Sequence, residues 1–426
     1  MAIDPQEFKR RRQQREQKRQ QQRLRQRKTM LRLGIAAGVL ILCAVLILVV
    51  TRKAPQEDPP VQTMAQTTAP AGQTQPEDTA TQPVTTVHFA AAGDLTVSDA
   101  VVNAGGGERN YTGAFLDVAH IFADADISAV NFEGNLYGSP YGTERRSAPQ
   151  SMAKALSEAG IDLVQLANSY AIHHGTLGLS STIDGIRSAG MEPLGVYADQ
   201  QAYRQGGGYI IRNVQGVRIA FVAFTKGMDG LALPAGSENC VNVLYTDYAS
   251  TYQTVDTEGI SAVLDRIAKD KPDITIALLH WGSEYNDTIS ASQKKIVTLM
   301  QEKGVDAIVG THSHYVQKIT FDQDTGFLVA YSLGDFFGEA QRPGTEYSVI
   351  LDLEITKDNT TGVTKITNYS YTPTFTVAEA DASQRVLRIR EAMAAYEAEY
   401  IDRVSQETYE AMKSALERIE ARITAK

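Results

Sequence analysis

Five of the seven histidines in this chain stand just after short apolar runs of the kind that form strands. They are His173, His174, His280, His312 and His314. Imidazole is the commonest metal ligand among protein side chains. A His-x-His pair such as His312 and His314 places two imidazoles on one side of an extended segment, which suits chelation. The spacing therefore predicts a metal site.

Acidic and amide side chains occupy the same kind of position after other apolar runs. They are Asp94, Asn131, Glu133, Asn168 and Asp335, and Glu284 lies a few residues beyond His280. Oxygen and nitrogen donors of these types favour Mn, Zn or Fe over a metal that prefers thiolates. Each residue alone has a plainer reading, because Gly-Asp is usually a turn and an isolated histidine is usually a packing residue. The ordered series favours one divalent ion or two.

The apolar runs themselves predict a layered α/β domain in which strands alternate with helices. We expect strands at Val87–Ala92, Ile127–Phe132, Leu163–Ala167, Arg218–Ala223, Ile274–Leu279, Ala307–Val309 and Phe327–Ser332. We expect helices at Pro149–Ala159, Gly178–Ala189, Gly259–Lys269 and Ala291–Lys303. Because open α/β sheets bind ligands outside the carboxyl ends of their strands, the polar residues that follow these strands should converge on one crevice.

Seven motifs resemble, in order, those of the CapA family, the capsule synthesis domain associated with poly-γ-glutamate. They are GDL (93–95), NFEGNL (131–136), DLVQLANS (162–169), GLSSTIDGIRSAGMEPLG (178–195), LLHWGSEY (278–285), GVDAIVGTHSHYVQ (304–317) and YSLGDFF (331–337). The resemblance covers residues 86–340. It implies a fold similar to calcineurin-like metallophosphoesterases, a layered sandwich of two mixed sheets flanked by helices.

The same resemblance implies a set of metal ligands. Asp94 stands at the first metal aspartate, and Glu133 stands where an acidic ligand bridges two metals. The other ligands it implies are Asn168, His280, His312 and His314. We assign Asn131, Glu284 and Asp335 to substrate binding.

The chain departs from the family pattern directly after Asn168. The family has a histidine in the position after its paired asparagines, whereas this chain reads Asn168-Ser169-Tyr170. In related phosphoesterases that histidine protonates the leaving group or steadies the transition state. Tyr170, His173 and His174 are the available substitutes, and we assign the catalytic role to the two histidines.

The amino-terminal part indicates a membrane anchor. Leu33–Val50 contains no charged residue, and at 1.5 Å per residue it is long enough to nearly cross a bilayer core of about 30 Å. The alternatives are a cleaved signal peptide and a buried helix of a soluble domain. Residues 1–32 carry twelve Lys and Arg against three acids, so the positive-inside rule keeps them in the cytoplasm and places the rest of the chain outside.

Four further features complete the expected organisation. Residues 51–84 are rich in Thr, Gln and Pro and should form a disordered stalk. Residues 85–380 should form the CapA-like domain, and residues 381–426 a long amphipathic helix that packs on the domain or pairs with a partner. Cys43 lies in the apolar run, which leaves Cys240 without a disulfide partner in the outer part.

Three functions fit this pattern. The first is synthesis or export of a surface polymer such as poly-γ-glutamate capsule, with the membrane, the anionic polymer or other capsule-assembly proteins as partners. The second is a metal-dependent surface phosphoesterase, and the third is a non-catalytic scaffold with a degenerate metal site. The basic residues 1–32 are better explained by membrane topology and anionic lipid than by nucleic acid, so no nucleic-acid partner is expected. Whether the chain is an enzyme stays open at this point.

Overall fold

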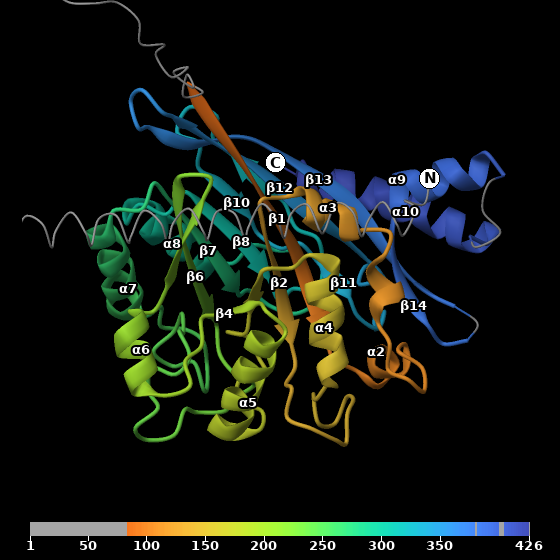
Figure 1. Cartoon of the computed structure of the whole chain (residues 1–426), viewed down its shortest axis with the longest axis horizontal. Helices are drawn as coiled ribbons and strands as arrows, with labels where there is room; N and C mark the ends of the chain where they lie inside the picture. The colour runs from red at the N-terminus through yellow and green to blue at the C-terminus, as the bar shows by residue number, and fades with distance from the viewer. Residues whose placement is uncertain (1–82, 380, 400–403, 426) are drawn as a thin grey trace, which may run out of the picture. The chain divides into compact units, whose positions relative to one another are not determined.

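The computed structural model describes residues 83–379, 381–399 and 404–425, whose elements are shown in Figure 1. Their strands form two mixed sheets, in the orders β14-β13-β12-β1-β2-β3-β4, with β11 paired to β1, and β5-β6-β7-β8-β10-β9. The bounds are β1 Val84–Thr96, β2 Ile127–Glu133, β3 Leu163–Gln165, β4 Glu192–Leu194, β5 Ile210–Val214, β6 Val217–Thr225, β7 Ile274–His280, β8 Ala307–Thr311, β9 Ile319–Phe321, β10 Leu328–Ala330, β11 Asp335–Phe337, β12 Tyr347–Asp358, β13 Thr364–Ala378 and β14 Gln384–Arg388.

Helices flank both sheets. Their bounds are α2 Asp99–Asn103, α3 Ala119–Asp124, α4 Gln150–Ala159, α5 Gly175–Ser188, α6 Gln200–Gly206, α7 Thr257–Asp270, α8 Ala291–Glu302, α9 Ile389–Glu397 and α10 Gln406–Ile423, with a 3₁₀ turn at Thr112–Phe115. Ile260 and Leu264 of α7 and Ile296 of α8 share one buried apolar cluster with strands β6 to β8. Helix α5 lies against β4, the edge strand of the first sheet.

An aspartate stands directly before each of four parallel strands and forms a hydrogen bond with the strand beside it. Each carboxylate accepts a hydrogen bond from a main-chain N–H of the adjacent strand, in the pairs Asp126–His88, Asp162–Ser128, Asp273–Arg218 and Asp306–Thr275. Across the core, Phe89 of the first sheet meets Phe221 of the second with ring centroids 5.3 Å apart. The strands therefore start in register, and their carboxyl ends reach the same edge of the molecule.

The seven predicted strands and four predicted helices are confirmed, as β1, β2, β3, β6, β7, β8, β10, α4, α5, α7 and α8. The long antiparallel pair β12 and β13 and five short strands were not predicted from the sequence. Strand β12 pairs with β1 over Val84–Ala91, so the first sheet continues well beyond the CapA-like motifs.

The expectation of one long helix over 381–426 is wrong. Gln384–Arg388 forms β14, which pairs with residues 374–378 of β13, and two helices follow it. The physical reason is that strand pairing with a distant segment overrides the helical pattern of the local sequence. A domain boundary at residue 380 would consequently cut the first sheet.

The predicted membrane segment Leu33–Val50 and residues 51–82 of the predicted stalk (51–84) lie outside the described residues, whereas Val84 already belongs to β1. Within the described residues, no helix is both long enough and apolar enough to cross a bilayer.

Candidate metal centre

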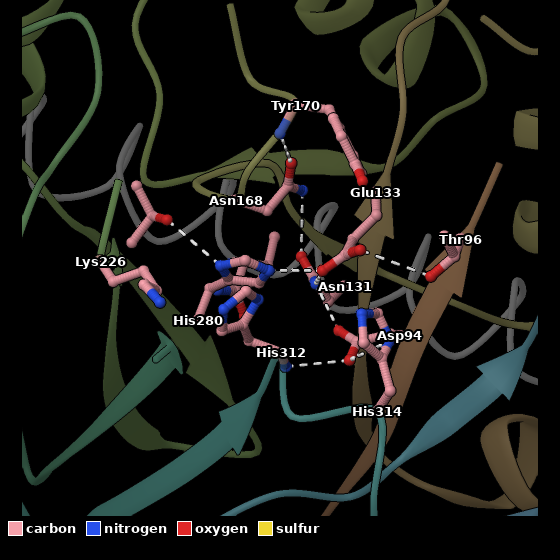
Figure 2. A network of polar contacts seen from close by, with 12 residues as sticks. Asp94, Thr96, Asn131, Glu133, Asn168, Tyr170, Lys226, His280, His312 and His314 are labelled. Carbon is pink, nitrogen blue, oxygen red and sulfur yellow. Dashed lines mark hydrogen bonds and ion pairs between the residues drawn. The ribbon is translucent and has the colours of Figure 1, made fainter. Parts of the chain in front are cut away.

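The two sheets bring six potential metal ligands together at the carboxyl ends of their strands. Figure 2 labels Asp94, Glu133, His280, His312 and His314 among them. Pairing of β11, β1 and β2 sets Asp335, Asp94 and Asn131 side by side in one row of the first sheet. His280 ends β7 of the second sheet, and His312 and His314 follow β8. The site is thus built across the seam between the two sheets.

Glu133, His280 and His312 form the first ligand group. Their ligand atoms all lie within 4.8 Å of one another, and none of the three residues is more than 3% exposed. The ring of His280 has its Nε2 in contact with the Glu133 carboxylate and its Nδ1 3.2 Å from the hydroxyl of Thr225. These contacts hold the His280 ring in one orientation, as second partners of metal-binding histidines do.

Asp94, His314 and Asp335 form the second group, also with ligand atoms within 4.8 Å of one another. The Nδ1 atom of His314 lies 2.7 Å from Oδ1 of Asp335 and 4.0 Å from Oδ2 of Asp94. All three residues are buried. The arrangement gives two neighbouring groups of nitrogen and oxygen donors, as a site for two ions requires.

Asn131 joins the two groups. Its Nδ2 donates to Oδ1 of Asp94 at 2.6 Å and to Oε1 of Glu133 at 3.3 Å, and its Oδ1 accepts from Nδ2 of Asn168 at 3.1 Å. A second link crosses the sheets, because the main-chain N–H of His312 donates to Oδ2 of Asp94 at 2.9 Å. The carboxylates are therefore fixed by hydrogen bonds before any ion binds.

The backbone of the site is unusual at three positions. His312 has φ +90° and His314 has φ +59°, in the left-handed region that side chains other than glycine rarely adopt. At Gly93 a Cβ atom would lie 1.9 Å from the carbonyl oxygen of Gly334, so only glycine allows β1 to pass this close. Left-handed residues of this kind cluster at functional sites, where the surrounding structure holds them in place.

Burial controls the protonation of the cluster. It raises the pKa of Asp94 to about 7, with a second contribution from the nearby Glu133, and it also raises the pKa of Glu133 and of Asp335. Burial lowers the pKa of His280 to about 3 and that of His312 well below its ordinary value. For His314 burial acts in the same direction, but Asp335 and the other carboxylates outweigh it and raise its pKa.

The residues fit a divalent cation. Both ring nitrogens of His312 are buried and have no hydrogen-bond partner within the described part of the chain, although buried polar atoms are normally satisfied. Three buried carboxyl groups with raised pKa values lie beside them, and a cation would favour their charged forms. The donors are imidazole and carboxylate without thiolate, a set that suits Mn, Zn or Fe.

A cavity of about 210 Å³ borders the first ligand group. Its lining residues are Ser169, Lys226, Gly227, Asp229, Tyr252, Ser283, Glu284 and His312. Among the six candidate ligands, His312 is the one that lines it. A small ligand in this cavity would meet the metal centre from the side of His312.

The three residues predicted to bind substrate lie in different surroundings. Asp335 groups with Asp94 and His314, and its predicted substrate contact stays a prediction. Asn131, also expected to contact substrate, is buried and its amide bonds to the site's own residues. Glu284 is exposed and lines the cavity, so its predicted substrate contact stays a prediction.

The amide of Asn168, a predicted ligand, is used inside the scaffold. Its Nδ2 donates to Asn131 and to the carbonyl of Phe132 at 2.7 Å, and its Oδ1 accepts from the N–H of Tyr170 at 3.1 Å. It therefore positions Asn131 in this structure. Metal ligation by Asn168 stays a prediction.

The predicted catalytic histidines bond to a loop. Nε2 of His173 lies 3.2 Å from the carbonyl oxygen of Glu144, and Nε2 of His174 lies 2.6 Å from that of Arg145. Neither belongs to the two ligand groups. These contacts fasten the 144–145 loop, and a catalytic role for His173 and His174 stays a prediction.

Two cationic residues near the site were missed. Lys226 directly follows β6, and this position after a strand is the same signal that marked the candidate ligands. Burial lowers its pKa. Arg146 stacks over the ring of Tyr170 at 4.4 Å and acts electrostatically on Glu133, but no sequence pattern marks it.

Comparison with known proteins adds the following. The model of a family described as "Bacterial capsule synthesis protein PGA_cap" matches residues 88–340, more than half of the chain. The chain is 28% identical over 217 residues to the "Capsule biosynthesis protein CapA" of Bacillus anthracis, covering 51% of this chain and 49% of that protein. It is 26% identical over 260 residues to the "PGA biosynthesis protein CapA" of Bacillus subtilis (strain 168), covering 58% and 62%. The matches thus span about half to three fifths of the curated relatives.

Among solved structures, the chain is similar to the calcineurin-like phosphoesterase YfkN from Bacillus subtilis. The identity is 14%, the TM-score is 0.38, and the match covers 79% of this chain and 100% of that chain.

Proposed function

Because the chain belongs to the bacterial capsule synthesis protein family PGA_cap, we propose that it acts in the synthesis or export of an anionic surface polymer. Poly-γ-glutamate is the polymer that the names of its relatives suggest. We further propose that the cluster at the strand ends is a divalent metal centre that serves this role.

The observation that carries the proposal is the state of His312. Its ring lies 4.3 Å from that of His280, centroid to centroid, with a ring nitrogen within 4.8 Å of the Glu133 carboxylate, and among the described residues neither of its nitrogens has a partner. Leaving a buried polar group unpaired costs about 1–3 kcal/mol. A cation coordinated by His312 would remove this cost.

A bound divalent ion supplies a Lewis acid and lowers the pKa of a water bound to it. The residues of the chain have separate tasks around it. Glu133, His280 and His312 would hold one ion, and Asp94, His314 and Asp335 would hold a second. Asn131 keeps the two groups in a fixed relation, and Thr225 orients the His280 ring.

A second candidate function is hydrolysis of phosphoesters at this centre. It is supported by Lys226, which lines the same cavity as His312 and would attract an anionic ester. The two functions are compatible, since the first is a biological role and the second is a reaction.

Metal content tests the proposal. We expect the purified full chain, in detergent, to carry one or two equivalents of Mn, Zn or Fe by elemental mass spectrometry. The His312→Ala/His314→Ala variant should lose most of it, because each ligand group loses a histidine. His88→Ala is the matched control, because His88 pairs with Asp352 outside the cluster.

Hydrolysis of a generic phosphodiester with added Mn²⁺ is measured on the same samples. Turnover that disappears in the double variant would support the phosphoesterase. Metal without turnover would leave a binding or scaffold role for the centre. Absence of metal from a folded wild-type chain would refute the metal centre itself.

We also propose that Leu33–Val50 anchors the chain in the cell membrane and that the domain faces outward. The support is the uncharged apolar run and the basic residues before it. In that position the domain would contact the polymer as the polymer leaves the cell, or would contact other capsule-assembly proteins.

A further inference from the structure

The cavity beside His312 has two chemically different ends. His312 is buried and Lys226 is partly buried, whereas Asp229, Ser283 and Glu284 are exposed. Figure 2 shows Lys226 on the side of the cluster where His280 and His312 lie. The inner end therefore carries an ammonium group and an imidazole, and the outer end carries two carboxylates.

Lys226 is held in place but has donors to spare. Its Nζ donates to the carbonyl oxygen of Gly282 at 2.9 Å and lies 4.6 Å from the ring centroid of Tyr252. Within the described residues no carboxylate lies close enough to form an ion pair with it. An ammonium group has three N–H donors, so the contact with Gly282 leaves two for a ligand.

We infer that this cavity is a subsite for a single oxyanion group of the substrate, a carboxylate or a phosphate, and that Lys226 is the residue that binds it. The inference rests on the proposed function, because it places the anionic group next to His312. It deepens that function by naming the substrate class and the residue that recognises it.

The outer carboxylates limit what can enter. Asp229 and Glu284 repel a second negative charge near the opening, so a polyanion would enter by one terminal group and would not lie along the cavity. The volume of about 210 Å³ suits a group of that size and not a polymer segment. Glu284 thus acts as a specificity residue and Lys226 as a binding residue.

The purely structural alternative is that Lys226 only ties the end of β6 to the loop after β7 through Gly282. In that case its charge is dispensable for ligand binding. The two readings differ in what happens to oxyanion affinity when the charge is removed and metal is kept.

The test uses the full chain in detergent, saturated with Mn²⁺, and isothermal titration calorimetry with two probes. Methylphosphonate represents the phosphate, and tetra-γ-glutamate represents the carboxylate. Lys226→Met should retain its metal and lose affinity about 10-fold or more, because hydrogen bonds to charged groups are the stronger kind. Lys226→Arg should stay within a few-fold of wild type. Lys154→Met, at a lysine whose side chain is 73% exposed, is the matched control and should change nothing.

Glu284→Gln should change affinity in the opposite direction, with tighter binding of both probes by a few-fold. Misfolding cannot produce that gain, so this variant keeps the test decisive if Lys226→Met is unstable. The probe that loses more affinity in Lys226→Met identifies the source of the oxyanion.

Wild-type affinity in metal-loaded Lys226→Met, or no binding of either probe by the loaded wild type, would overturn the subsite. Absence of metal from the wild type would instead refute the metal centre. The same comparison of variants, made without metal, would then still decide the role of Lys226.

Discussion

Asn131 belongs to neither of the two candidate ligand groups, but its hydrogen bonds connect them. Its amide donates to carboxylates of both ligand groups and accepts from Asn168. An amide can do this because it carries two donors and an acceptor, whereas a carboxylate would only accept. The identity of the residue at 131 therefore sets the spacing between the groups.

Asp306 carries a prediction at the same scale. Burial raises the pKa of this carboxyl to about 6, although its oxygen accepts the N–H of Thr275 at 2.8 Å. The folded state thus binds the proton more tightly than the unfolded state. Stability should fall as the pH rises through the window between about 4 and 6, and the full penalty should be present above it.

Asp306→Asn removes the charge and keeps an oxygen acceptor. We expect it to raise the free energy of unfolding at pH 7.5 by about 1–3 kcal/mol, since each pKa unit corresponds to about 1.4 kcal/mol. The gain should shrink toward pH 4.5, and urea denaturation at both pH values measures it.

Asp273→Asn is the control, because Asp273 occupies the same place before β7 but pairs with Lys357 at 2.7 Å. It should give no gain. A gain for Asp306→Asn that does not depend on pH would contradict the explanation.

At the scale of elements, the first sheet depends on residues beyond the matched family region, which ends at residue 340. Strand β12 pairs with β1, and β13 and β14 extend the sheet further. Because Asp94 lies on β1, these later strands help to hold the second ligand group in position.

Helix α10 is part of this support. It buries Met412, Ala415, Ile419 and Ile423, and its Arg422 lies 4.7 Å from the ring of Tyr315, the residue after His314. The helix therefore packs on the domain, one of the two outcomes expected for the carboxyl-terminal segment.

We expect Ile419→Ala to lower the free energy of unfolding by about 2–4 kcal/mol, because it opens a cavity under α10. Glu417→Ala, two residues earlier on the exposed face of the helix, should change it by less than about 0.5 kcal/mol. Urea denaturation of both variants measures the difference. Equal, small effects would show that α10 does not pack on the domain in solution.

At the scale of the whole molecule, charge is distributed unevenly. Residues 1–32 carry a net charge of +9, while the whole chain carries −9, so the remainder carries −18. This acidic remainder of the chain would bind a polyanion poorly through its overall field, which makes a local cation such as Lys226 or a bound metal more important.

Membrane fractionation tests the proposed anchor. We expect the full chain to stay with membranes after extraction at alkaline pH, and external protease to reach the domain on intact cells. Deleting Leu33–Val50 should release the chain from the membrane fraction, because the remaining segments lack a comparable apolar run. Release of the full chain by alkaline extraction would argue against a spanning segment.

The sequence by itself determined the strands that end in polar residues and the convergence of those ends. Apolar runs and the turn residues that bound them are local signals, so β1, β2, β7 and β8 could be recognised without knowing which strands lie beside them. The resemblance to the CapA family then implied ligand roles for Asp94, Glu133, His280, His312 and His314, five of the six candidate ligands that the structure groups.

Only the tertiary structure decided how these residues divide into two groups and what surrounds them. Asp335 lies beside Asp94 because β11 pairs with β1. Residues 384–388 form strand β14 because they pair with the edge of β13. The ammonium group of Lys226 contacts Gly282 and Tyr252, which belong to other loops. Such contacts depend on pairing and packing between segments far apart in the chain, and no local pattern of residues encodes them.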